Sequence, residues 1–169
     1  INNTHYLIPS DVATQFALHY ADISSAQQYT PELTNTLDHT LTTLSFQSDN
    51  TEPYNAIFTL SELTHAISRC GNTSVGPDQI AYPFFKNLTE TGLNTLLDTL
   101  NSLWENNTYP SSWSPSTLIP ILKPKKPSYD PASYRPISLT SCASKLFERM
   151  VNGRIRVYLE ANKILSEFQ

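Results

Sequence analysis

The sequence predicts a mostly α-helical protein with one small antiparallel β-hairpin, an α+β fold. Apolar residues recur with helical spacing in four segments. Only two short runs have the length and β-branching of strands, and a loop rich in Pro and Lys separates them. The chain has 169 residues, the length of about one domain. Because only 39% of these residues are apolar, we expect a small core.

The four helices are expected at residues 10–22, 59–69, 90–106 and 141–160. The second has Thr59 and Glu62 in the spacing of a capping box, with each side chain able to bind the other residue's backbone N–H. The third and fourth carry the most regular apolar faces and are expected to supply the core. Their apolar positions are Leu93, Leu96, Leu97, Leu100, Leu103 and Trp104, and then Leu146, Phe147, Met150, Val151, Ile155, Tyr158 and Leu159.

The segment 24–58 is rich in Ser, Thr, Asn and Gln and reads mainly as loop. Leucines at 33, 37, 41 and 44 allow one short amphipathic helix within it. Gly76-Pro77-Asp78 interrupts the helical pattern, and we expect the Asp78 carboxylate to cap a short helix that contains Phe84 and Phe85.

The predicted hairpin consists of strands at residues 118–122 and 135–139. Pro120 restricts the first strand to a sheet edge, since proline cannot donate a ladder hydrogen bond. Lys123 and Arg135 lie at the two arms of the loop. Such cations can bind phosphates, with Arg doing so through two parallel bonds. From this pattern alone, cations that merely solvate a Pro-rich loop are the favoured interpretation.

Charge is distributed unevenly along the chain. Residues 1–110 hold two basic and 11 acidic side chains, a net charge of −9, whereas residues 111–169 hold nine basic and four acidic ones, a net charge of +5. This asymmetry is a hint of a polyanionic partner for the second part, and on charge alone ordinary surface variation explains it equally well.

Several function classes lack support in the sequence. There is no run of about 18 apolar residues for a membrane span, so we expect no membrane partner. Two cysteines are too few for a zinc site or disulfide scaffold, and we expect no metal site. The four histidines are expected to be solvated. Four glycosylation sequons are about the number that chance gives this composition, so a secreted glycoprotein is not indicated.

A series of short motifs follows between residues 76 and 169. They are Gly76-Pro77-Asp78, Leu103-Trp104, Ile119-Pro120-Ile121-Leu122-Lys123-Pro124, Ser133-Tyr134-Arg135-Pro136-Ile137-Ser138-Leu139, and Lys145-Leu146-Phe147-Glu148-Arg149. In this order they resemble the reverse transcriptases, or RNA-directed DNA polymerases, of non-LTR (LINE-type, jockey-like) retrotransposons. The resemblance makes 76–169 the fingers region of a right-hand polymerase and 1–75 an upstream helical linker segment.

The resemblance implies that the hairpin closes over the incoming dNTP. Arg135 would then contact the triphosphate, with Lys123 as the closest match to a lysine on the preceding arm and Lys125 and Lys126 as further dNTP- or nucleic-acid-binding residues. The family usually has Gly after Lys-Pro, where this chain has Lys125. RNA template, DNA primer and dNTPs are the partners implied for the full-length protein.

No catalytic residue is assigned to this chain. The resemblance places the catalytic aspartates, and the Mg²⁺ implied for the full-length enzyme, in a palm that would follow Gln169. Two-metal phosphoryl transfer needs such carboxylates. We therefore expect a fragment of a nucleotidyltransferase that is inactive alone. The alternative is a non-catalytic RNA-binding or interaction remnant of a mobile element. The resemblance implies an intracellular location, with the nucleus as the candidate compartment.

Overall fold

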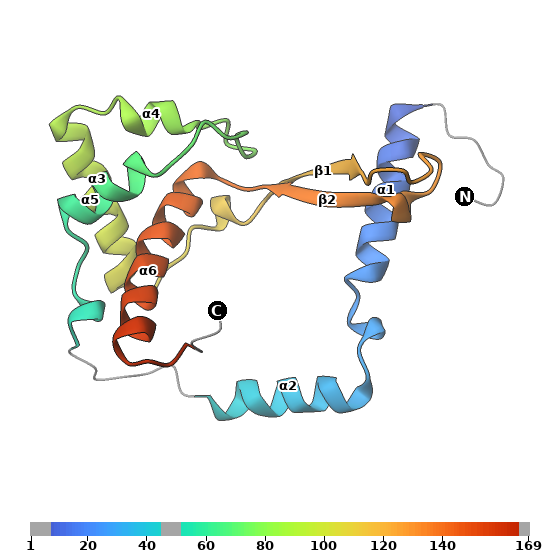
Figure 1. Ribbon diagram of the computed structural model, residues 1–169, viewed down its shortest axis with the longest axis horizontal. Helices are drawn as coiled ribbons and strands as arrows, with labels where there is room; N and C mark the ends of the chain where they lie inside the picture. Colours follow the sequence, from blue (N-terminus) through green and yellow to red (C-terminus); the bar gives the residue numbers. More distant parts are fainter. Residues whose placement is uncertain (1–7, 45–51, 166–169) are drawn as a thin grey trace. The chain divides into compact units, whose positions relative to one another are not determined.

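The computed structural model describes residues 8–44 and 52–165 (Figure 1). Within them the chain forms six α-helices and one two-stranded antiparallel sheet, which confirms the predicted α+β class. The elements are α1 (Pro9–Ile23), α2 (Pro31–Thr43), α3 (Leu60–Ser68), α4 (Tyr82–Lys86), α5 (Glu90–Glu105), β1 (Thr117–Leu122), β2 (Tyr134–Leu139) and α6 (Cys142–Ala161). None of these helices combines the length and the hydropathy that crossing a bilayer requires.

The chain divides into two compact units. The hairpin unit comprises Ile1–Asp49 and Leu118–Ile137, and the helical unit comprises Asn50–Thr117 and Ser138–Gln169. This division does not follow the boundary after residue 75. The boundary after residue 75 separates the upstream segment from the fingers region that the resemblance implies. It stays a prediction.

Polar side chains define where the helices begin. The capping box at the start of α3 is confirmed, because Thr59 Oγ1 accepts from Glu62 N–H and Glu62 Oε2 accepts from Thr59 N–H. Ser141 caps α6 by accepting from the N–H groups of Ala143 and Ser144. These bonds satisfy donors that a helix leaves free in its first turn.

The core lies in the helical unit, between α3, α5, α6 and the residues just before α3. Its least exposed side chains are Phe58, Leu63, Leu100, Leu146 and Cys142. Leu100 is 1% exposed and Phe147 is 9% exposed, which confirms the prediction that the helices over 90–106 and 141–160 supply the core.

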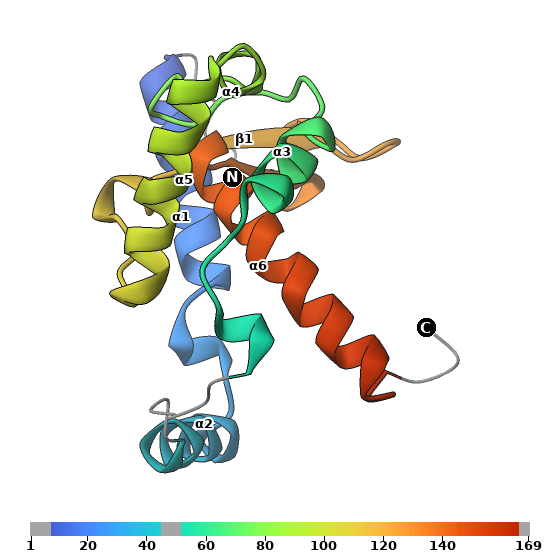
Figure 2. The same cartoon turned by 90° about the vertical axis from the view of Figure 1, so that its left-hand side faces the viewer.

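The predicted apolar face of α6 is buried along only part of the helix. Leu146, Phe147 and Met150 are buried, whereas Ile155 is 50% exposed and Tyr158 is 39% exposed. Figure 2 shows why: the C-terminal half of α6 extends beyond α3 and α5. The expectation that Ile155 and Tyr158 belong to the core was therefore wrong.

A buried amide holds the segment that precedes α3. Asn101 of α5 accepts from Phe58 N–H at 2.6 Å and donates from Nδ2 to Phe58 O at 3.0 Å. The ring of Phe58 packs against Trp104 and Phe147. Trp104 also donates from Nε1 to Asn55 O at 3.1 Å. Asn101 thus provides the hydrogen bonds that a neighbouring strand would otherwise give Phe58.

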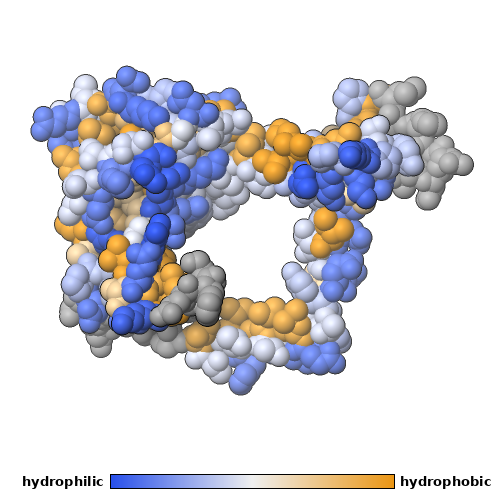
Figure 3. Space-filling view, in the orientation of Figure 1, coloured by the Kyte–Doolittle hydropathy of each residue, from blue (hydrophilic) through white to orange (hydrophobic). Residues whose placement is uncertain are grey.

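The hairpin unit buries little apolar surface. Tyr20 is the one buried apolar side chain among the unit's described residues. The short helix suggested by the leucine spacing forms as α2, but Leu33, Leu37 and Leu41 remain 44–62% exposed. Figure 3 shows these apolar side chains as a band along α2, and a second apolar area on the hairpin strands.

Asp78 does not cap a helix. Its Oδ1 accepts from Ile80 N–H at 3.1 Å within a turn, and α4 begins only at Tyr82, after Ala81, which has no capping side chain. Three residues separate Asp78 from the start of α4, and its carboxylate binds Ile80 N–H instead of a helical N–H group, so the capping prediction was wrong.

Candidate functional site

The hairpin loop, residues 123–133, is closed by hydrogen bonds from its own backbone. Lys123 N–H donates to Ser133 O at 2.9 Å, and Lys126 N–H donates to Lys123 O at 3.2 Å. Lys125 lies inside this second turn with φ of 59°, in the left-handed region that favours glycine. Glycine, which the resemblance implies at this position, adopts such a φ without strain.

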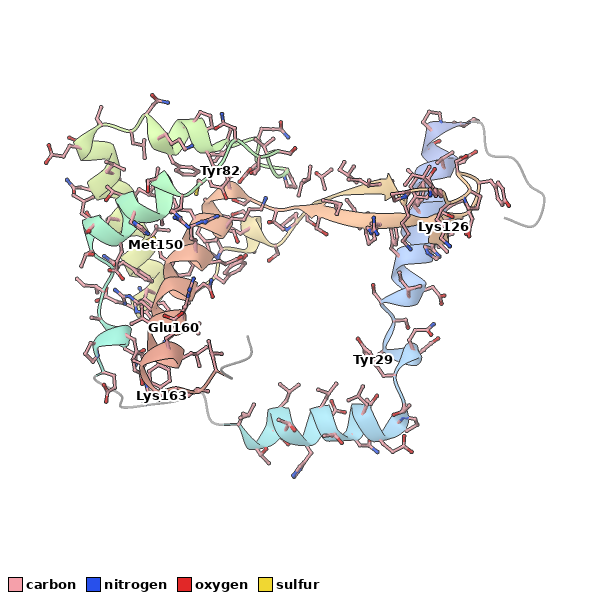
Figure 4. The ribbon with its side chains drawn as sticks, in the orientation of Figure 1. Tyr29, Tyr82, Lys126, Met150, Glu160 and Lys163 are labelled. Atoms are coloured by element: carbon pink, nitrogen blue, oxygen red, sulfur yellow. The ribbon has the colours of Figure 1, made fainter. Side chains whose placement is uncertain are left out.

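Three predicted site residues lie in this loop. Lys123 is half-buried and donates from Nζ to Ala132 O at 2.9 Å, so its ammonium group stabilises the loop itself. Lys125 and Lys126 are exposed, and no hydrogen bond or ion pair of their side chains occurs within the described residues. Figure 4 shows Lys126 at the loop end of the hairpin.

Arg135, the fourth predicted site residue, is exposed on β2. Its guanidinium group has no hydrogen bond or ion pair with any residue that the structure describes. Asp130, the acid closest in sequence, instead caps the short 3-10 turn Pro131–Ser133 by accepting from Ala132 N–H at 2.9 Å. Arg135 is therefore available to bind an anion, and its use in an internal ion pair with Asp130 is not observed.

Aromatic contacts hold the loop against α1. The rings of Phe16 and Tyr134 meet edge to face with 4.8 Å between centroids, and Phe16 also stacks on Tyr20 at 5.9 Å. Tyr134 donates from its hydroxyl to Ser128 O at 3.0 Å. The Tyr20 hydroxyl is buried with no partner among the described residues, and this burial raises the pKa of Tyr20. The cationic loop therefore has a fixed support.

In the helical unit, the Gly76-Pro77-Asp78 motif meets the backbone that joins the two last motifs. A Cβ atom on Gly76 would lie 2.6 Å from the carbonyl carbon of Thr140 and 2.7 Å from the backbone nitrogen of Ser141. The Gly76-Pro77-Asp78 turn therefore packs directly on the backbone where β2 leads into α6. Only glycine fits this approach, which gives the motif a structural role.

A hydrogen-bonded chain follows on the first turns of α6. The Ser144 hydroxyl, fully buried, lies 2.7 Å from Tyr109 Oη and donates to Glu148 Oε1 at 2.6 Å. These bonds connect the Lys145–Arg149 motif of α6 to the segment after α5. They satisfy a buried hydroxyl, which gives the arrangement a stabilising role.

Sequence reasoning missed Arg154, which it treated only as one of nine basic residues in the second part. Arg154 is 13% exposed and forms an ion pair with Glu62. Arg154 follows Phe147 by seven residues and Met150 by four, which places it on the apolar face of α6. An arginine on an apolar helix face was the signal in the sequence that could have identified it.

Titratable groups elsewhere do not form a metal centre. Among the described residues, no three His, Cys, Asp or Glu side chains are grouped so that they can hold an ion. Burial raises the pKa of Tyr82 to about 12, with Cys70 and Cys142 adding to the shift. Both cysteines are buried and unbonded to each other. No site for Mg²⁺ is assigned to this chain.

Comparison with known proteins yields relatives of one kind. The chain is 34% identical over 103 residues to the probable RNA-directed DNA polymerase from transposon X-element of Drosophila melanogaster, a match that covers 61% of this chain. It is 33% identical over 96 residues to the probable RNA-directed DNA polymerase from transposon BS of the same species. It is 28% identical over 118 residues to the RNA-directed DNA polymerase from mobile element jockey. No protein-family model matches the chain.

These matches confirm the resemblance to reverse transcriptases of non-LTR retrotransposons. They cover 57–69% of this chain but only 11–13% of the length of the relatives. The matched part of the chain thus spans about a tenth of the length of these relatives.

Proposed function

We propose that this chain is part of an RNA-directed DNA polymerase of a non-LTR retrotransposon, and that it contributes the fingers. Its hairpin then binds the incoming dNTP and the template. The similarity to three transposon polymerases supports the family. The observation that carries the finer assignment is Arg135, whose exposed guanidinium has no partner among the described residues.

The chemistry of Arg135 suits a triphosphate. A guanidinium presents a planar set of donors that matches two phosphate oxygens at once. Pro136 follows directly and has a fixed φ, which limits the motion of the strand at this point. Arg135 therefore binds and orients the phosphates, while Lys125 and Lys126 add positive charge at the loop. Lys123 supports the loop through its bond to Ala132 O.

The chain alone is proposed to be inactive. Mg²⁺ supplies the charge stabilisation for nucleotidyl transfer when it is bound by carboxylates. In the polymerases resembled, those carboxylates belong to the palm. Primer extension by the 169-residue chain in the presence of Mg²⁺, template, primer and dNTPs would contradict this part of the proposal.

The experiment that tests the dNTP role uses a polymerase that contains this chain. Arg135→Ala should lower steady-state kcat/KM for dNTP by at least about tenfold, the effect of losing about 1.4 kcal/mol of binding. The matched control is Arg156→Ala, because Arg156 is also a surface arginine, 73% exposed, whose one ionic partner among the described residues is Glu160. A normal kcat/KM for Arg135→Ala would sink the assignment, and an equal loss in both variants would point to a general effect of charge.

The alternative, a non-catalytic RNA-binding remnant, makes a different prediction. The polymerase carrying this chain would then fail to extend any primer, while the chain still bound RNA.

A further inference from the structure

The hairpin loop displays one aromatic side chain in solvent. Tyr129 is 80% exposed, the largest exposed fraction of any large hydrophobic side chain that the structure describes. It follows Lys125 and Lys126 by three or four residues in the same loop. An aromatic ring that is this exposed is open to a partner from solution, and two lysines precede it in the same loop.

The backbone on both sides of Tyr129 is fixed. On one side, the carbonyl of Ser128 accepts from the Tyr134 hydroxyl at 3.0 Å. On the other side, Asp130 binds Ala132 N–H through its carboxylate, and Asp130 O accepts from Ser133 N–H at 2.9 Å. The loop therefore holds the Tyr129 backbone in place while its ring projects outward.

The support continues into α1. Tyr134, which holds Ser128, is itself held by the edge-to-face contact with Phe16. A ring on a preorganised backbone loses little conformational entropy when it binds a partner. The arrangement is that of an exposed aromatic side chain on a fixed backbone, with two lysines three and four residues before it in the same loop.

We propose that Tyr129 stacks on an unpaired base of a single-stranded nucleic acid whose phosphates are bound by Lys125 and Lys126. This inference rests on the proposed function, in which the hairpin binds the template, and it assigns Tyr129 to that binding. A flat ring beside flexible cations suits bases and phosphates that alternate along a single strand. A duplex keeps its bases stacked on one another and offers no free face to the ring.

The test is the affinity of the 169-residue chain for a fluorescein-labelled, unstructured 20-nucleotide RNA, measured by fluorescence anisotropy. Tyr129→Ala should weaken binding by about 5- to 100-fold, the effect of losing one base–aromatic stack. Tyr129→Phe, which keeps the ring, should bind within about twofold of the wild type. Tyr129→Leu should behave like Tyr129→Ala, because leucine keeps an apolar side chain but has no ring to stack on a base.

Salt dependence separates stacking from charge. For single strands, each phosphate contact contributes about 0.7 to the slope of log K against log salt. Tyr129→Ala should leave that slope unchanged, whereas Lys125→Gln and Lys126→Gln should each reduce it by about 0.7. The matched control is Tyr29→Ala. Tyr29, labelled in Figure 4, is also exposed, at 52%. Residues 1–68 contain no Lys or Arg, so Tyr29 has no cation near it in the sequence.

Four results would overturn the inference: no RNA binding by the wild-type chain, unchanged affinity in Tyr129→Ala, equal loss for Tyr129→Phe, or equal loss on a 20-base-pair duplex. None of them affects the dNTP role of Arg135, which is measured by incorporation. Conversely, Arg135→Ala could have a normal kcat/KM while Tyr129→Ala weakens RNA binding as expected. In that case the hairpin loop binds RNA but the hairpin does not bind the dNTP.

Discussion

Arg154 of α6 binds Glu62 of α3 through two parallel hydrogen bonds, Nε to Oε1 at 2.7 Å and Nη2 to Oε2 at 2.9 Å. The same guanidinium donates to the carbonyl groups of Tyr54, Ala56 and Ile57 and lies 4.2 Å from the centre of the Phe58 ring. One side chain thus fastens the segment before α3, and the start of α3, to α6.

Replacing Arg154 by Lys should destabilise the chain. An ammonium group keeps the charge but cannot make the paired bonds to Glu62 together with the bonds to three carbonyls. We expect the free energy of unfolding to fall by about 2–4 kcal/mol, as for lost charged hydrogen bonds in a partly buried site. Urea unfolding followed by circular dichroism measures the change. Arg156→Lys is the matched control and should leave stability unchanged, since the Arg156–Glu160 pair is exposed.

The Arg154–Glu62 pair should also make stability depend on pH. Hydrogen bonding to Arg154 holds the pKa of Glu62 at about 2, below its ordinary value of 4.5. A carboxyl with a lowered folded-state pKa contributes its full stability above its unfolded pKa and loses it as pH falls through the folded one. The Glu62 contribution should therefore be complete above about pH 5 and disappear between about pH 4.5 and 2.

The measurement is the difference in unfolding free energy between the wild type and Glu62→Gln. This difference should be large at pH 6 and should shrink as the pH approaches 2. A difference that is constant over this range would show that Glu62 titrates normally in the folded chain.

Gly76→Ala should destabilise the helical unit, because the new Cβ would lie 2.6–2.7 Å from the backbone of Thr140 and Ser141. Backbone atoms cannot move aside as a side chain does, so we expect a loss of about 1–3 kcal/mol, as for overpacking. Gly153→Ala is the control. Gly153 lies within α6 with no atom in the way of a Cβ, so alanine should stabilise the helix by about 0.5–1 kcal/mol. Equal melting temperatures for the two variants would contradict the close approach at Gly76.

Lys125→Gly should stabilise the hairpin loop. Lys125 has a φ of 59°, which costs a side-chain-bearing residue energy that glycine avoids. We expect a gain of up to about 1 kcal/mol, reduced by the greater freedom of glycine in the unfolded chain. Lys126 has no positive φ, so Lys126→Gly should not stabilise. Thermal unfolding of both variants checks the difference, and a rise in melting temperature for Lys126→Gly alone would contradict it.

Local patterns in the sequence predicted local structure well. The Thr59–Glu62 spacing predicted a capping box, and the periodicity over 90–106 and 141–160 predicted helices that bury Leu100 and Phe147. Each of these features depends on residues within a few turns of one another. The limits of the pattern appear at Ile155 and Tyr158, whose exposure depends on how far the neighbouring helices reach along α6.

The features that the sequence did not reveal join distant residues. Asn101 binds Phe58 across 43 positions, and Arg154 binds Glu62 across 92. Asn101 and Arg154 could both be recognised in the sequence as polar residues on an apolar helix face. Nothing near either residue in the sequence identifies the residue that it binds. The proposed anion-binding role of Arg135 came from its place at one arm of the predicted hairpin, and the family resemblance added the triphosphate as its ligand. The structure adds that its guanidinium is unpaired among the described residues.

The most direct test of the central claim is Arg135→Lys in a polymerase that contains this chain. The two-bond contact requires a guanidinium, so lysine should raise the apparent KM for dNTP, or lower kcat if the contact strengthens during transfer. The KM for template–primer and the melting temperature should stay unchanged, and Lys145→Arg should have a much smaller effect. Normal kcat/KM for dNTP in Arg135→Lys, or a loss explained entirely by a lower melting temperature, would contradict the assignment of this hairpin to the dNTP.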